Sequence, residues 1–146
     1  MPINPTSEQI AALSAVAGTE TDGPLVMLNL NRYREHAAYD SEPPGGESPD
    51  VSGREAYARY GVAAQAMLER VGGKILWYAQ SDSTVIGDES DRYDEVLAVW
   101  YPSRAAFLSL ATAPEILAAL PHRVAALDRA SIVVCEAGPE PVLNGA

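Results

Sequence analysis

The residues with the clearest capacity for chemistry are His122 and Arg123, which follow Pro121. An imidazole ordinarily titrates near neutrality, where a side chain is most effective as a general acid or base. Arg123 could bind a carboxylate or an enolate through charge-assisted hydrogen bonds. We expect Pro121 to interrupt a helix, because it lacks an N–H donor, and so to expose His122 at a bend. The alternative is a surface His–Arg pair, or a histidine that caps a helix end.

Asn29 lies in the middle of the apolar run 25–30, where a polar amide needs hydrogen-bond partners. It could orient a substrate carbonyl or stabilise an oxyanion, or it could bond to the backbone in a purely structural role. Arg32 ends the same segment and could clamp an anion or form a surface salt bridge. Asp94 could orient His122 as a carboxylate orients a catalytic imidazole, or form a simple ion pair.

Four aromatic residues are further candidates. Tyr57 and Tyr60 lie three residues apart on one face of a predicted helix, so either hydroxyl could donate to a ligand, although core packing is typical of such a stripe. Trp77 and Trp100 lie on predicted strands and could line an apolar pocket, or pack in the core or a dimer interface. The resulting hypothesis assigns catalysis to His122, Asn29 and Tyr57, and substrate binding to Arg123, Arg32, Tyr60, Trp77, Asp94 and Trp100.

Helices and strands must bring these residues together. Capping boxes at Thr6/Gln9 and Ser52/Glu55 predict helices over about 6–17 and 52–71. Apolar runs predict strands over 25–30, 74–80, 95–101 and about 130–135. A further helix begins near Pro102 and restarts at Pro114.

After the first helix the order is βαββαβ, the ferredoxin-like α+β arrangement, in which helices cover one face of an antiparallel sheet. We divide the chain into an accessory helix (1–22), a ferredoxin-like domain (23–137) and a flexible tail (138–146). The segment 34–51 is long, polar and rich in Pro and Gly, which is typical of either a lid-like loop or a disordered segment.

Three predicted strands are apolar on both faces: 25–30, 96–100 and 132–135. An antiparallel sheet with one solvated face should alternate between apolar and polar residues. The chain has no spare element large enough to cover the second face. We therefore expect a second copy to pack on it, sheet against sheet, in a two-fold homodimer.

Composition excludes several classes of function. The chain has 146 residues, 10 Lys plus Arg, 20 Asp plus Glu and a net charge of −10, which disfavours binding to nucleic acid. No apolar stretch is long enough for a membrane span, and a single Cys135 favours a reducing, cytoplasmic location. Only His36 and His122 could supply imidazole ligands, and Gly-rich phosphate loops are missing, so we expect no metal and no cofactor.

The chain also resembles a known family. The matching segments are Val26–Tyr33, Gly53–Gly61, Val71–Gly73, Val85–Gly87, Tyr93–Val96, Tyr101–Phe107 and Ala119–Arg123. In order and spacing they resemble the family called domain of unknown function 1330, over roughly residues 24–135. The resemblance implies a ferredoxin-like fold that dimerises as an α/β barrel, and no settled activity. Related dimeric barrels include cofactor-independent monooxygenases, muconolactone-isomerase-like enzymes and haem-degrading enzymes.

Two hypotheses of function follow. The first is a small cofactor-independent enzyme that moves a proton in a carbonyl or carboxylate compound, as an isomerase, lyase or monooxygenase-like protein would. The second is a non-catalytic dimeric protein that binds a small molecule in the same pocket. A structural dimer without a ligand is a third possibility.

Overall fold

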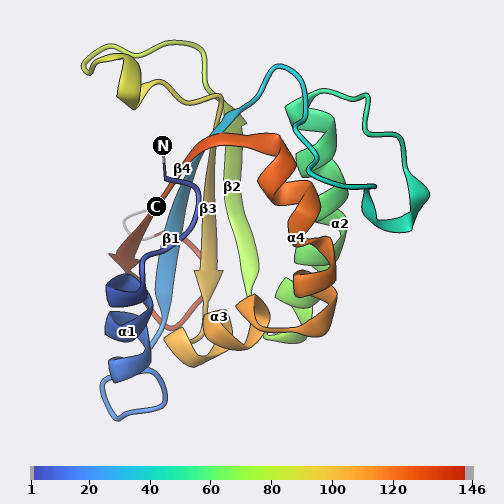
Figure 1. Cartoon of the computed structure of the whole chain (residues 1–146). Helices are drawn as coiled ribbons and strands as arrows, with labels where there is room; N and C mark the ends of the chain where they lie inside the picture. Colours follow the sequence, from blue (N-terminus) through green and yellow to red (C-terminus); the bar gives the residue numbers. More distant parts are fainter. Residues whose placement is uncertain (1, 144–146) are drawn as a thin grey trace.

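The structure, a computed structural model, describes residues 2–143, which form an α+β unit with a four-stranded antiparallel sheet and four helices (Figure 1). The strands lie in the spatial order β2-β3-β1-β4. The strand bounds are β1 (Leu25–Tyr33), β2 (Lys74–Gln80), β3 (Glu95–Tyr101) and β4 (Leu127–Glu136). The helix bounds are α1 (Ser7–Val16), α2 (Gly53–Arg70), α3 (Arg104–Ala111) and α4 (Pro114–Ala126), with 3-10 turns at Pro44–Gly46 and Glu89–Asp91.

The helix starts follow the predicted capping residues. At α1 the Thr6 hydroxyl accepts from the Gln9 N–H at 3.1 Å, and the Gln9 side chain accepts from the Thr6 N–H at 2.8 Å, which completes the capping box. At α2 the Ser52 hydroxyl accepts from the Glu55 N–H at 3.0 Å. The Glu55 carboxylate meets the Ser52 hydroxyl at 3.3 Å, so the reciprocal bond of the predicted second box is replaced by a side-chain contact.

The expectation that Pro121 interrupts a helix is wrong. Helix α4 runs through it from Pro114 to Ala126, and His122 is buried with 5% of its surface exposed. Proline leaves the carbonyl four residues earlier, on Leu117, without its helical donor. Both Pro121 and Leu117 lie on the exposed side of α4, where water can supply that bond. The solvent-facing position therefore makes an interior proline tolerable.

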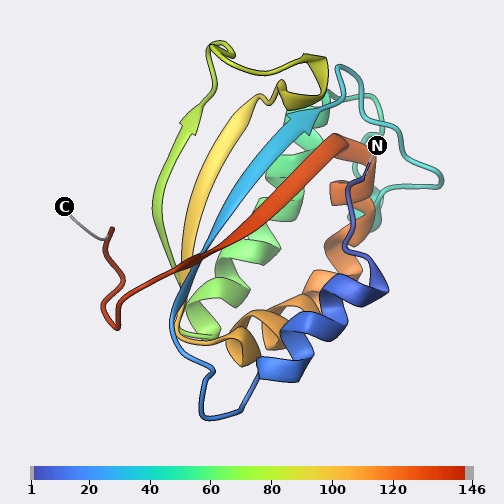
Figure 2. The same ribbon diagram turned by 90° about the vertical axis from the view of Figure 1, so that its left-hand side faces the viewer.

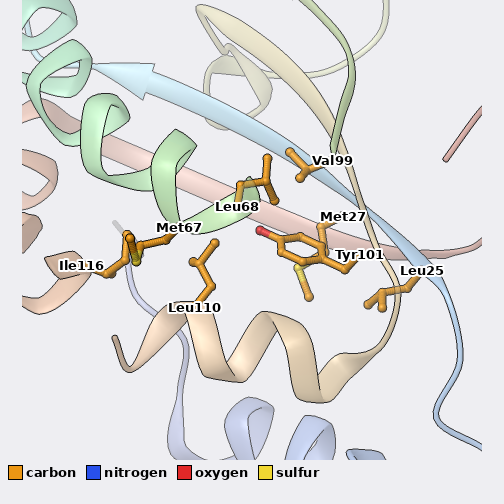
Figure 3. Close-up of a cluster of buried hydrophobic side chains, with 8 residues drawn as sticks. All are labelled: Leu25, Met27, Met67, Leu68, Val99, Tyr101, Leu110 and Ile116. Carbon is orange, nitrogen blue, oxygen red and sulfur yellow. The ribbon is translucent and has the colours of Figure 1, made fainter. Parts of the chain in front are cut away.

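The helices lie on one side of the sheet (Figure 2). The main core fills the space between the helices and the sheet. Leu25 and Met27 project from β1 into this core, each with 1% of its surface exposed. They pack with side chains from β3, α2, α3 and α4, namely Val99, Tyr101, Met67, Leu68, Leu110 and Ile116 (Figure 3). Burial of each large side chain contributes about 2 kcal/mol.

The opposite face of the sheet carries no helix (Figure 2). Alternate residues of β1 point there, namely Val26, Leu28 and Leu30, beside Trp100, Ala98 and Val96 of β3 in register. The tail returns toward this face, because the Trp100 indole N–H donates to the Gly138 carbonyl at 3.1 Å. The flexible tail predicted over 138–146 lies partly outside the described residues, at 144–146.

The long segment 34–51 packs over the ends of α2 and α4. The Arg34 N–H donates to the Ala126 carbonyl at 2.8 Å, and the Gly53 N–H donates to the Arg34 carbonyl at 3.0 Å. Gly53 permits this close junction, because a Cβ there would lie 2.7 Å from the Ala126 oxygen and even closer to the Arg34 oxygen. The 3-10 turn Pro44–Gly46 also contacts α4. These contacts hold the segment against α2 and α4 in the structure.

Candidate functional site

His122 is covered by the loop 34–51 and by α2. The Tyr39 hydroxyl lies 2.7 Å from His122 Nδ1, and the two rings meet edge to face. Arg59, on α2, donates to the Tyr39 oxygen at 3.2 Å and to the Ser48 carbonyl at 2.8 Å. The Arg59 guanidinium also pairs with the Glu47 carboxylate at 2.8 Å. We call His122, Tyr39, Arg59 and Glu47 the histidine cluster.

The electrostatics of the histidine cluster favour a neutral imidazole. Burial lowers the pKa of His122, and the positive charge of Arg59 lowers it further. The negative charge of Glu47 acts in the opposite direction but does not reverse the shift. His122 is therefore uncharged near neutral pH and can exchange a proton without first losing one to water.

A second polar group lies under the helices, on the covered face of the sheet. Asn31 of β1 has 3% of its surface exposed, and its amide nitrogen has no hydrogen-bond partner among residues 2–143. Burial raises the pKa of the adjacent Tyr57, and the Asn31 side chain, acting as a donor toward the Tyr57 oxygen, lowers it in part. The geometry of that contact falls short of a hydrogen bond, so the amide nitrogen counts as unpaired. Leaving a buried donor unpaired costs about 1–3 kcal/mol. Such an atom therefore requires an explanation.

Arg123 extends this group from α4. Its positive charge lowers the pKa of Tyr57 and of Tyr60, while burial raises both, so both hydroxyls stay protonated. The Arg123 guanidinium donates to the Ile3 carbonyl at 2.6 Å and to the Asn4 side chain at 3.1 Å. It forms no ion pair with a carboxylate among the described residues. We call Asn31, Tyr57, Tyr60 and Arg123 the donor cluster.

The donor cluster is continuous with a polar groove at the end of β1. The Tyr33 ring packs 5.3 Å from the Tyr57 ring, and the Arg54 guanidinium lies 5.0 Å from the Tyr33 ring centre. The Tyr33 hydroxyl donates to Glu95 at 2.8 Å; burial and this carboxylate raise the pKa of Tyr33. The groove has a volume of about 720 Å³ and is lined by Tyr33, Arg34, Glu35, His36, Ser52, Arg54, Arg92, Asp94 and Asp128.

The structure therefore brings some of the predicted site residues together and separates others. Tyr57, Tyr60 and Arg123 meet in the donor cluster. The Asn29 amide donates to the Met27 carbonyl at 3.1 Å, the structural role that was the alternative interpretation, whereas His122 bonds to Tyr39.

Asp94 and Arg32 hold the loop between β2 and β3. The Asp94 carboxylate accepts from the Tyr33 N–H at 2.8 Å, so Tyr39, and not Asp94, orients His122. Arg32 is buried with 3% exposed; it pairs with Asp128 at 2.9 Å and donates to the Glu89 carbonyl at 2.8 Å. Both side chains stabilise the loop geometry in this structure.

The two tryptophans lie on the face of the sheet that carries no helix. Trp77 of β2 is 47% exposed, and Trp100 of β3 is buried next to the chain tail. Neither belongs to the donor cluster or to the histidine cluster.

Sequence reasoning missed Asn31, Tyr39, Arg59 and Glu47. Asn31 had a usable signal, since it shares its strand face with Asn29 at the two-residue period of a strand. Tyr39 and Glu47 lie in the irregular loop, where no periodicity indicates orientation. Their partnership with Arg59 depends on how the loop folds over α2.

Two general searches of the described residues are negative. No group of three or more His, Cys, Asp or Glu residues between 2 and 143 could hold a metal ion. No single helix in that range combines the length and apolar composition of a membrane span; α3 and α4 reach them only jointly, across a 73° bend.

Comparison with known proteins gives the family. The sequence model described as "Domain of unknown function (DUF1330)" matches residues 47–137. The chain belongs to this family. Membership of the DUF1330 family implies no particular activity, because the family is described as having no known function. No curated protein matches the chain.

Two solved structures resemble this DUF1330 protein over most of its length. The crystal structure of RPA0582, a protein of unknown function from Rhodopseudomonas palustris, is 36% identical with a TM-score of 0.76, and covers 90% of this chain and 93% of its own. The crystal structure of methylated RPA0582 protein is 36% identical with a TM-score of 0.79, and covers 94% and 96%.

Proposed function

We propose that this DUF1330 protein is a small cofactor-independent enzyme that binds a small carboxylate or carbonyl compound at the donor cluster and moves a proton in it. The observation that carries the proposal is the buried, unpartnered amide nitrogen of Asn31. Leaving this nitrogen unpaired costs free energy in the ligand-free protein. That cost is offset when an acceptor oxygen of a ligand forms a hydrogen bond with it.

The chemistry of the donor cluster supports this ligand class. Asn31, Tyr57 and Tyr60 supply neutral donors, and Arg123 supplies a positive charge without a carboxylate partner among the described residues. Donors alone, without a matching set of acceptors, suit a ligand whose oxygens accept hydrogen bonds. The same donors would stabilise an enolate or another oxyanion as negative charge develops on it.

The groove beside Tyr33 supports an access route. Arg54 and Tyr33, which stack on each other, both line the groove, and the Tyr33 ring also contacts the Tyr57 ring. A rotation of the Arg54 side chain, which is paired with Glu95 at 3.7 Å, would open the way toward Tyr57. His122, which precedes Arg123 on α4, is the proton-transfer group in this proposal.

The alternative is a non-catalytic dimeric protein that binds a small molecule. The hydrogen bond of Asn29 to the Met27 carbonyl favours it, because an amide held by the backbone is not directed at a substrate. In both cases we propose a ferredoxin-like protomer that pairs through the face of the sheet without helices, to form an α/β barrel in the cytoplasm. The apolar residues Val26, Leu28 and Leu30 support the pairing, because water is an unfavourable neighbour for a contiguous apolar patch.

A thermal-shift screen of small carboxylates and ketones tests the proposal. A bound compound raises the Tm of the wild type by mass action. Tyr57→Phe removes one hydroxyl of the donor cluster and should weaken binding about tenfold, the equivalent of about 1.4 kcal/mol. The matched control is Tyr78→Phe, because Tyr78 is 66% exposed on β2.

The outcomes separate the two functions. A compound that stabilises the wild type and the Tyr78→Phe variant, but stabilises Tyr57→Phe less, supports binding at the donor cluster. Conversion of that compound by the wild type and not by His122→Gln supports the enzyme, whereas equal binding without conversion supports the binding protein. If no compound shifts the wild type, the donor cluster is not a carboxylate site.

A further inference from the structure

The direction of the proton between Tyr39 and His122 follows from the third member of the histidine cluster. Arg59 has only donors, and one of its terminal nitrogens donates to the Tyr39 oxygen at 3.2 Å. The single proton of the Tyr39 hydroxyl needs an acceptor, and His122 Nδ1 lies 2.7 Å away. If Nδ1 carried a proton instead, the tyrosine oxygen would face two donors and its own proton would have no acceptor in the cluster.

We infer that Tyr39 is a positioning residue that holds His122 as the neutral tautomer with its proton on Nε2. Arg59 in turn fixes Tyr39, because its guanidinium is itself held by Glu47 at 2.8 Å and by the Ser48 carbonyl.

Nε2 is the ring nitrogen of His122 that remains available to a ligand, because Nδ1 is bonded to Tyr39. It makes no hydrogen bond to residues 2–143, and the Asn31 amide nitrogen is the one fully buried polar side-chain atom without a partner in that range. His122 Nε2 therefore keeps contact with solvent even though the side chain as a whole is 5% exposed. A ligand that reaches this nitrogen meets an N–H donor.

This assignment deepens the proposed function and rests on it for its catalytic meaning: His122 serves as the acid of the reaction. In the donating step, the Nε2 proton passes to an oxyanion of the substrate, and the Tyr39 proton passes to Nδ1. The Nε2–H and Tyr39 O–H bonds break, the substrate O–H and Nδ1–H bonds form, and the negative charge ends on the Tyr39 oxygen beside Arg59. The substrate class is thus a carbonyl compound whose enolate or alkoxide intermediate is protonated on oxygen.

The tautomer can be read directly by nitrogen NMR on the whole chain labelled with ¹⁵N-histidine. The sequence contains only two histidines, so His36→Gln assigns both rings. We expect His122 to show a proton-bearing Nε2 and a bare Nδ1 near neutral pH. A bare Nε2 with a protonated Nδ1, or a fully protonated ring, overturns the inference, whatever the variants do.

Tyr39→Phe then tests the cause. It removes the donor to Nδ1, so we expect His122 to become a mixture of tautomers, and Tyr78→Phe to leave the spectrum unchanged. An unchanged His122 spectrum in Tyr39→Phe means that Tyr39 does not position the ring. If Tyr39→Phe does not fold, Arg59→Lys replaces it, because losing the bond to Tyr39 should produce the same mixture.

The pH dependence of the His122 nitrogen signals reports the protonation of the ring as well as its tautomer. The charged and titratable groups that face His122 are Tyr39 and Glu47 from the loop and Arg59 from α2.

The spectrum needs no ligand, so a protein that binds no carboxylate would still show the tautomer. Failure of the proposed function and failure of this inference are therefore distinguishable.

Discussion

The two faces of the sheet each depart from the arrangement that a half-covered sheet usually has. On the face under the helices, β1 changes from Leu25 and Met27 to Asn29, Asn31 and Tyr33. On the face without helices, the same strand presents Val26, Leu28 and Leu30. The covered face therefore holds polar groups beside its apolar core, and the face without helices carries half-buried apolar side chains.

Neither departure favours the stability of an isolated protomer. A covered face optimised for packing would hold no unpartnered amide such as that of Asn31. An uncovered face adapted to water would alternate with polar side chains. The proposed ligand would account for the first departure, and the proposed pairing of two copies would account for the second.

The largest expected effect is on the face without helices. Leu28→Glu places a charge at the centre of the proposed interface, where burial without a partner is strongly unfavourable. We expect the wild type to elute as a dimer and the variant as a monomer in size-exclusion chromatography with light scattering. Leu117→Glu is the control, because Leu117 is 52% exposed on α4. A monomeric wild type would remove the explanation for the apolar face.

The next effect concerns the junction that closes the covered face. Gly53→Ala introduces a Cβ against the carbonyl oxygens of Arg34 and Ala126, and we expect it to lower the free energy of unfolding by about 1–3 kcal/mol. Gly61→Ala in the same helix meets open space and should raise it by about 0.5–1 kcal/mol. Urea unfolding of both variants measures the difference. Equal effects would mean that the junction is not tight.

Asn31→Leu tests whether the unpaired amide on the covered face lowers the stability of the free protein while it serves the proposed ligand site. Replacing an unpartnered buried amide by an apolar side chain of similar shape should stabilise the free protein by about 1–2 kcal/mol. The same change should abolish ligand binding. Asn29→Leu is the control, because the Asn29 amide donates to the backbone and its loss should destabilise. Destabilisation by Asn31→Leu would show that the amide has a partner in solution.

The smallest effect is the pH dependence of the two histidines, which extends the comparison from covered to exposed groups. The pKa of His122 is lowered by burial, so the unfolded chain takes up a proton first and stability falls as the pH drops below about 6.5. The pKa of His36 is raised by its bond to Asp50 at 2.7 Å, so its contribution is complete below about 6.5 and is lost as the pH rises.

Urea unfolding between about pH 5 and pH 8 measures both contributions. His122→Gln should flatten the loss on the acid side, and His36→Gln should remove the small gain there. A wild type whose stability does not change over this range, with both variants parallel to it, would contradict the two assignments.

Much of the fold was predictable because local signals agree. The strands β2 and β3 begin and end where their apolar runs do, and Thr6 and Ser52 cap helices as expected. Pro121 was misjudged, because its effect depends on whether the freed carbonyl faces water, which a sequence does not state. Strand β4 extends beyond the predicted range at both ends because it pairs with the full length of β1.

The candidate site was predictable only where residues share one element. Tyr57 and Tyr60 were correctly placed on one face of α2, with ring centres 5.5 Å apart. The partners of His122 were not predicted, since Tyr39 lies 83 positions away in an irregular loop. A contact of that range depends on tertiary packing and leaves no periodic trace in the sequence.

The sequence by itself determined the alternation of strands and helices, the apolar pattern on both faces of the sheet and the candidate role of His122, because these depend on residue type and local spacing. Only the tertiary structure decided which polar groups meet. The covered position of Asn31 and the fold of the loop over α4 set those contacts, because burial and hydrogen-bond geometry arise where distant segments pack together.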